Sequence, residues 1–411
     1  MTSDIALENT APATKGVSLG EDAWRRLKKD RVAMLSLVVL CLVTLLAFFT
    51  PMLPLQPPDQ DDTKLKFQPP QASPFLETSF ELDAAAIEAS YRRRAETEAK
   101  FAQQQSDPPE AVENSTSVDQ AKLQQKEQRR VKDTLDDIVQ RPYGDAGFPV
   151  LGGLSRWMVR CRLTLFGNRS IGSICGRDKL GRDIFSRIFW GARISLIVGV
   201  VATLVSLVIG VSYGAIAGYF GGWVDDAMMR IVDVLYSVPF IFVVIFLLSI
   251  LGQEDVKYQL EGWGIDRITI FYLVVGAIYW LTMARVVRGQ VISLKNAQFV
   301  EAAQALGRTH LGIIFSHIVP NLFSIVIVYL TLTIPRVILF EAFLSFLGLG
   351  VEPPDVSWGL LANEGIIVIT PVKIYWWLIV FPSLAIGVTL FSLNFLGDGL
   401  RDALDPRLRD E

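Results

Sequence analysis

Apolar runs of membrane-spanning length recur along this chain, and polar stretches separate them. A helix rises 1.5 Å per residue, so about 20 apolar residues cross the ~30 Å hydrocarbon core of a bilayer. The runs that approach or exceed this length are residues 32–50, 194–218, 231–252, 269–287, 321–340 and 375–396. The pattern predicts an all-α polytopic membrane protein with six transmembrane helices and a long polar insertion after the first helix.

The composition agrees with this prediction. Hydrophobic residues make up 51% of the 411 residues and charged residues only 20%, which is more apolar than a soluble chain of this size needs. The charges are unevenly distributed, because 40 of them lie within residues 51–190. The predicted parts are a cytoplasmic N-terminal segment (1–31), transmembrane helix 1 (32–50), an extracytoplasmic insertion (51–190), a membrane core with helices 2–6 (191–397) and a cytoplasmic C-terminal tail (398–411).

The charges that flank the apolar runs predict the orientation. Basic residues gather just before the first run, at Arg25, Arg26, Lys28, Lys29 and Arg31. The positive-inside rule then places the N-terminus in the cytoplasm, and six alternating crossings of the cytoplasmic membrane place the C-terminus there as well. A second basic cluster does not fit, because it precedes the second run on the predicted outside; it consists of Arg177, Lys179, Arg182, Arg187 and Arg193. The rule is weak for long loops.

The insertion has an unusual composition. Residues 84–140 are rich in Glu, Gln, Lys, Arg and Ala, with a break at Pro108 and Pro109. Such residues favour helix on each side of the prolines but offer little apolar surface to bury, so they predict a mobile helical hairpin or partial disorder, not a compact enzyme domain. Cys161 and Cys175 follow, and the sequence leaves open whether they form a disulfide.

Several function classes are excluded. The net charge of −3, without a basic field, argues against nucleic acid as a partner. Three cysteines and two histidines without paired spacing predict no metal site. Gly176 and Gly181 have the spacing of a phosphate-binding loop, but Arg182 and Asp183 occupy the positions of its Lys and Ser/Thr. With no hydrolase or metalloprotease motif either, the sequence predicts no catalytic residue and no cofactor.

Small residues mark one face of the second predicted helix. Gly210, Gly214 and Gly218 recur at every fourth position, which allows another helix backbone to approach closely. The pattern predicts helix packing, and both internal packing and an oligomer interface remain open.

Few ionisable residues lie at mid-helix in the apolar runs, and Arg336 and Glu341, which follow Pro335, are the exception. Such residues usually face protein or water. They are candidates for a polar pair in a transport pathway or in the core. Pro335 predicts a kink there, followed by a short helix or re-entrant turn through residues 341–350.

The most informative segment lies on a predicted cytoplasmic loop. Glu301, Ala302 and Ala303 are followed by Gly307, in a pattern that resembles the loop with which ABC importer permeases dock onto their ATPase subunits. The physical logic is consistent, since a helix with small residues can enter a groove on a partner. Glu301 can pair there with a basic residue, and Gly307 can turn the chain.

Further motifs extend the resemblance. They lie at residues 181–196, 218–225, 229–239, 344–359 and 394–407, and in this order they are similar to the C-type permease subunit of dipeptide, oligopeptide and nickel ABC importers. The resemblance implies the type I importer fold. It also implies a second, homologous permease subunit, two cytoplasmic ATP-binding subunits and an extracytoplasmic solute-binding protein as partners. Residues 55–170 are not part of it.

The implied function is transport of di- or oligopeptides, or of a related small solute, driven by ATP hydrolysis on the partner subunits. The chain itself would not be an enzyme. A permease for nickel chelates or other non-peptide solutes would share these motifs. A secondary transporter would need coupling-ion ligands in mid-membrane, where only Arg336 and Glu341 come close. A sensor or scaffold built around the insertion is a third alternative, and an exporter is disfavoured by the importer-type loop.

Overall fold

The computed structural model describes residues 19–71, 82–106, 117–251, 253, 256, 260, 267–351 and 355–404. Within these ranges the regular structure is helical, apart from an isolated bridge between Arg177 and Asp183. The N-terminal half contains α1 (Leu19–Leu27), α2 (Arg31–Phe49), η1 (Thr50–Met52), η2 (Thr63–Leu65), α3 (Ala84–Ser106), α4 (Ser117–Asp145), α5 (Gly153–Phe166) and α6 (Ile184–Phe220). The C-terminal half contains α7 (Gly222–Ser237), α8 (Phe240–Leu251), α10 (Arg267–Leu294), α11 (Gln298–Ala305), α12 (His310–Ile313), η3 (Ile314–Ile318), α13 (Val319–Asn321), α14 (Phe323–Phe346), α15 (Trp358–Ile367) and α16 (Trp377–Leu404).

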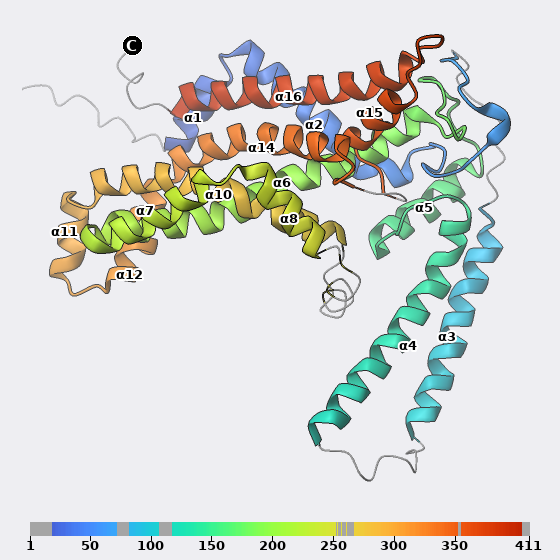
Figure 1. Ribbon diagram of the computed structural model, residues 1–411, viewed down its shortest axis with the longest axis horizontal. Coiled ribbons are helices and arrows are strands. Elements are labelled where there is room, and N and C mark those ends of the chain that lie inside the picture. The colour runs from blue at the N-terminus through green and yellow to red at the C-terminus, as the bar shows by residue number, and fades with distance from the viewer. Residues whose placement is uncertain are drawn as a thin grey trace, which may run out of the picture.

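The predicted class, an all-α membrane protein with about six spans, is confirmed. Among the described residues, four helical segments are long and apolar enough to cross a bilayer: Arg31–Met52, Ile184–Phe220, Phe323–Phe346 and Trp377–Leu404. Two bent helix pairs bring the number to six when each pair is taken as one span. Figure 1 shows these helices running alongside one another in an elongated bundle.

The third predicted span, residues 231–252, is not a single helix. Gly222–Ser237 and Ile241–Leu251 meet at 87°. Pro239 has no N–H to donate into a helix, and it restricts Val238 to the extended conformation seen there (φ −83°, ψ 126°). The apolar run is therefore continuous while the helix is broken.

The second span begins ten residues earlier than the apolar run predicted. Helix α6 starts at Ile184, inside the predicted insertion, because the Asp183 carboxylate accepts hydrogen bonds from the backbone N–H groups of Phe185 and Ser186, both at 3.2 Å. Such a cap satisfies N–H groups that have no partner within the helix.

Helix α14 also differs from the prediction. It continues through Pro335 to Phe346, and no separate element begins at Glu341. The short helix that follows is α15, which begins at Trp358 and is capped by the Ser357 hydroxyl.

The two ends of the bundle have different structures. At one end, Leu27 of α1 and Ala33 of α2 pack against Ala403 in the last turn of α16. Figure 1 shows α11 and α12 at this same end, whereas α5, α15 and the long helices of the insertion lie at the other.

The insertion contains the two helices that its composition predicted. Helices α3 and α4 lie side by side and project away from the bundle (Figure 1), and an ion pair between Arg94 and Asp136 (3.1 Å) joins them. The break at Pro108 and Pro109 lies outside the described residues. At its base the pair rests on an apolar cluster that includes Ile87, Tyr143, Phe148 and Trp190, which ties it to the start of α6.

Cys161 and Cys175 do not form a disulfide. Both are free thiols, with Cys161 half-buried on α5 and Cys175 buried in a separate apolar cluster beside Trp377.

Candidate functional site

The predicted docking segment forms a short helix with one anchored and one free face. On α11, Val300 is fully buried and Ala303 is 6% exposed, and both pack into a core cluster with Ile313 and Ile314. Glu301, Ala302 and Leu306 are exposed, Leu306 to 87%. The buried face fixes the helix to the bundle, so the free face is presented in a defined orientation.

Gly307 ends this helix for a conformational reason. Its φ is +74°, in the left-handed region that glycine adopts without strain, and no atom lies within 4 Å of the position that a Cβ would occupy. The backbone conformation, not lack of space, therefore favours glycine here. The chain then enters α12, where the Thr309 hydroxyl accepts a hydrogen bond from Gly312 N–H at 3.3 Å.

The loop is also held to the end of α6. The Tyr219 hydroxyl lies 3.0 Å from His310 Nδ1, and Gln304 Nε2 donates to the same hydroxyl at 3.4 Å. A displacement of α11 would therefore reach α6 directly.

The structure places the glycine face of α6 against α10. A Cβ at Gly210 would lie 2.6 Å from the Met283 Cβ, and one at Gly214 would overlap the Ala284 carbonyl oxygen. At Gly218 the Arg288 carbonyl oxygen would be 2.8 Å away. These glycines serve close packing within this chain.

Gly214→Ala is expected to lower the free energy of unfolding, because the added methyl group would meet backbone that cannot move aside. Overpacking of this kind costs about 1–3 kcal/mol. Gly289→Ala on α10 is the matched control, since nothing lies within 4 Å of its Cβ position. Thermal unfolding of the detergent-solubilised protein measures both. Equal stability of the two variants would contradict the packing assignment.

Five charged residues, of which Asp178, Arg182 and Arg187 are buried, form a cluster at the opposite end of the bundle. We call it the outer ion cluster, and its members are Asp59, Asp178, Arg182, Arg187 and Glu364. Arg182 donates to Asp178 at 2.7 Å, to Asp59 at 2.9 Å and to Glu364 at 3.0 Å. Arg187 donates to Asp178 at 2.8 Å and also to Glu364. The cluster joins the start of α6 to α15 and to the segment after α2.

Electrostatic pairing dominates at Glu364. Burial alone raises the pKa of this carboxyl, but Arg187 and Arg182 outweigh it and hold the pKa below its ordinary value. The pKa of Arg182 is raised because its carboxylate partners outweigh its burial. Both groups are therefore charged at neutral pH.

The outer ion cluster contains Arg182 and Arg187, two of the basic residues that did not fit the positive-inside rule. Two others are used internally as well. Arg177 donates to the Gly181 carbonyl at 2.7 Å, and Arg193 donates to Ser155 at 2.9 Å while lying over the Trp190 ring. These arginines serve the fold, so they carry no information on orientation.

Arg336 and Glu341 do not form the pair that the sequence suggested. Glu341 is fully buried and accepts hydrogen bonds from Ser195 at 3.2 Å and Ser345 at 2.9 Å. Arg336 is exposed on α14. The two residues therefore have separate roles.

A cavity of about 320 Å³ lies where α7 meets α8, and its lining was not predicted. The lining residues are Leu235, Tyr236, Val238, Pro239, Tyr279, Leu281, Thr282 and Phe340. The hydroxyls of Tyr236 and Thr282 are 2.6 Å apart. In the sequence only Pro239 marks this place. Apart from Val238, the other lining residues come from α7, α10 and α14, which are far apart along the chain.

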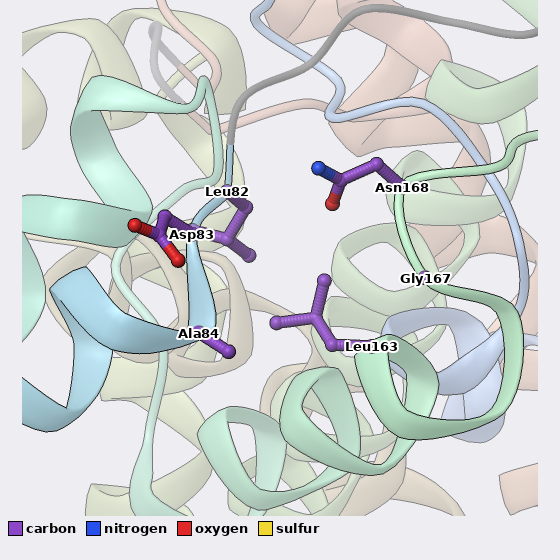
Figure 2. Close-up of a pocket in the computed structure, with 6 residues that line it drawn as sticks. All are labelled: Leu82, Asp83, Ala84, Leu163, Gly167 and Asn168. Carbon is purple, nitrogen blue, oxygen red and sulfur yellow. The ribbon is translucent and has the colours of Figure 1, made fainter.

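A larger cavity, of about 430 Å³, lies in the insertion between the start of α3 and the end of α5. Figure 2 shows its lining, which is Leu82, Asp83, Ala84, Leu163, Gly167 and Asn168. The Asp83 carboxylate already accepts a hydrogen bond from Ala85 N–H at 2.8 Å. None of the residues singled out in the sequence lies here, so we do not assign this cavity to the function.

Comparison with known proteins gives a consistent result. Residues 210–410 match the family of binding-protein-dependent transport system inner membrane components, and residues 18–70 match the N-terminal transmembrane domain of oligopeptide transport permease C. Residues 71–209, which contain most of the insertion, lie outside both matches.

Individual relatives agree with the family match. The dipeptide transport system permease protein of Bacillus subtilis is 46% identical over 234 residues, which cover 57% of this chain and 68% of the relative. The oligopeptide transport system permease protein of Escherichia coli K12 is 47% identical over 238 residues, covering 58% and 74%. A glutathione transport system permease protein of Pectobacterium atrosepticum is 42% identical over 237 residues, covering 57% and 72%.

A solved structure is similar at a lower level. A chain of the MetNI methionine ABC transporter, in an inward-facing conformation, aligns with a TM-score of 0.41 and 17% identity, covering 53% of this chain and 96% of that one.

Proposed function

Since this chain belongs to the family of binding-protein-dependent transport system inner membrane components, we propose that it is the C-type permease subunit of an ABC importer for di- or oligopeptides. The transport systems to which the relatives belong support a peptide cargo, because dipeptides, oligopeptides and glutathione are all short peptides. They favour this cargo over a nickel chelate.

The observation that carries the proposal is the two-faced helix α11. Its buried face is fixed through Val300 and Ala303, and its free face presents Glu301 next to the exposed Leu306. Among the described residues Glu301 makes no ion pair, so its carboxylate is available to a partner. We assign Glu301, Ala302 and Gly307 to docking onto a cytoplasmic ATP-binding subunit, whereas Ala303, which the sequence grouped with them, is buried and fixes the helix that presents them.

The partners follow from this assignment. A second, homologous permease would complete the pathway, two ATP-binding subunits would dock at the α11 end, and a solute-binding protein would dock at the α15 end. Residues 1–31 and the C-terminal end of the chain would then lie in the cytoplasm, and the insertion from residue 51 to the start of α6 at Ile184 would lie outside. Membrane helices 2–6 would run from α6 to α16. The packing of α1 on the end of α16 supports a common side for both termini.

Energy would enter through the docked subunits. ATP-driven closure of the ATPase pair would move α11, and the contacts of Tyr219 with His310 and Gln304 would pass this movement to α6. A helix bundle with two arrangements could then alternate between inward-open and outward-open states.

A secondary transporter has less support. Its intramembrane carboxylate would be Glu341, which is enclosed by the hydroxyls of Ser195 and Ser345. This arrangement holds α14 against α6 and offers no water-accessible site for a coupling ion.

Co-purification tests the proposal. The tagged chain, expressed together with the genes of a candidate second permease and its ATPases, should retain all of them through detergent extraction and size-exclusion chromatography. A stable homodimer of this chain that transports peptide without ATPase subunits would contradict it.

A further inference from the structure

Arg336 is an exposed cation in the middle of a membrane-spanning helix. It lies near the midpoint of α14 (Phe323–Phe346), and no carboxylate among the described residues forms an ion pair with it. A charged side chain is costly in hydrocarbon, so it normally faces protein or water inside a bundle. This face of α14 therefore borders a polar space or a partner.

The cavity at the α7–α8 joint adjoins this residue. Phe340, which lines the cavity, is one helical turn beyond Arg336 and shares its face of α14. The Tyr279 hydroxyl, also in the lining, donates to the Arg336 carbonyl oxygen at 3.2 Å. The backbone of Arg336 thus adjoins the cavity lining, although Arg336 is not itself a lining residue.

A second, independent feature lies at the same cavity, namely a break in a membrane helix. Val238 and Pro239 line the cavity at the point where α7 and α8 meet at 87°. Non-helical backbone at membrane depth is tolerated only where it is buried in protein or lines a water-filled space. The helix break and the backbone of Arg336 therefore adjoin the same cavity.

The other cation beside the cavity is neutralised. Arg285 pairs with Asp233 at 2.7 Å and lies over the Tyr236 ring, 4.1 Å from its centroid. Arg336 is left as the positive charge available to an incoming group among the described residues.

We propose that Arg336 binds the carboxylate of a peptide as the peptide passes the cavity at the α7–α8 joint. The planar guanidinium matches a carboxylate with two parallel hydrogen bonds. The hydroxyls of Tyr236 and Thr282 supply further polar contacts, and the volume of about 320 Å³ is within the range of small-ligand pockets. The site rests on the proposed function and adds the chemical group of the cargo that the pathway recognises.

Arg336→Gln tests this assignment in the reconstituted complex with the second permease, the ATPases and the binding protein. We expect uptake of radiolabelled trialanine to fall about tenfold or more, the effect of losing a charge-assisted hydrogen bond. The melting temperature of the peptide-free complex should stay unchanged or rise, because the substitution removes an unpaired charge. Arg336→Lys, which keeps the charge, should retain more uptake than Arg336→Gln, and Arg169→Gln in the exposed part of the insertion is the control.

Each alternative gives a different result. If Arg336 pairs with a carboxylate of the second permease, Arg336→Gln would lower uptake and melting temperature together, which would overturn the proposal. Uptake by Arg336→Gln within twofold of the wild type would overturn it as well, as would equal losses in Arg336→Gln and Arg336→Lys. A wild-type complex that moves no peptide in this assay would instead contradict the proposed function itself.

Discussion

Glu301→Lys is expected to abolish ATP-dependent peptide uptake while the chain still inserts into the membrane. Glu301 is exposed on a helix whose opposite face is anchored, so the substitution leaves the packing of Val300 and Ala303 intact. Loss of a charge-assisted hydrogen bond to the ATPase would weaken docking by about 1.5–3 kcal/mol, and the reversed charge adds repulsion. Uptake, ATPase activity and co-purification of the ATPase, measured side by side, check this prediction.

Glu88→Lys is the matched control, because Glu88 is an exposed carboxylate on α3 in a surface pair with Arg92. It should transport like the wild type. Normal uptake by Glu301→Lys would contradict the docking role of α11, and only the assignment of the fold would stand.

Gly307→Val should reduce uptake through the backbone. A β-branched residue is strained at a φ of +74°, so the turn between α11 and α12 would change direction even though the space around Gly307 is open. The cost of a left-handed conformation is about 1–2 kcal/mol per residue. Restoring uptake with Gly307→Asn, which tolerates this region better, would tie the effect to conformation; equal uptake by Gly307→Val and the wild type would contradict it.

Glu364→Ala is expected to cost about 3 kcal/mol of unfolding free energy. Its carboxylate is 15% exposed and pairs with Arg182 and Arg187, whose side chains are 3% and 1% exposed. Removing one partner of a buried ion pair leaves uncompensated charge and typically costs 3–5 kcal/mol. The lower end applies because Asp178 still contacts both arginines.

Thermal unfolding of the purified protein measures this effect, with Glu88→Ala as the control. Glu88 and Arg92 form an exposed i,i+4 pair, which contributes about 0.3–0.5 kcal/mol. If the two variants lost equal stability, the outer ion cluster would not fasten α15 to α6 as the geometry indicates.

The spans could be predicted from the sequence because their length is set by the bilayer. The predicted bounds of a helix are wrong where distant contacts, and not the local run of apolar residues, determine where the helix begins. The start of α6 was missed because residues 184–193 contain Arg187 and Arg193, which read as polar flank. Arg187 is in fact paired with Glu364, 177 positions further along the chain, and no local pattern reveals such a partner.

The candidate site was predicted unevenly for the same reason. Glu301 and Gly307 belong to one continuous segment, so their spacing carried the signal. The glycines of α6 predicted close packing, but the sequence did not say that α10 is the partner. Arg336 and Glu341 are five positions apart on one helix. Residues at this spacing point in different directions, so the two side chains do not meet.

The most direct test of the account is peptide uptake by proteoliposomes that contain this chain, the second permease and the two ATPases, with the binding protein added outside. Uptake of labelled trialanine should require ATP inside and the binding protein outside, and it should be lost when this chain carries Glu301→Lys. Uptake that persists without ATP or without the ATPase subunits would contradict it.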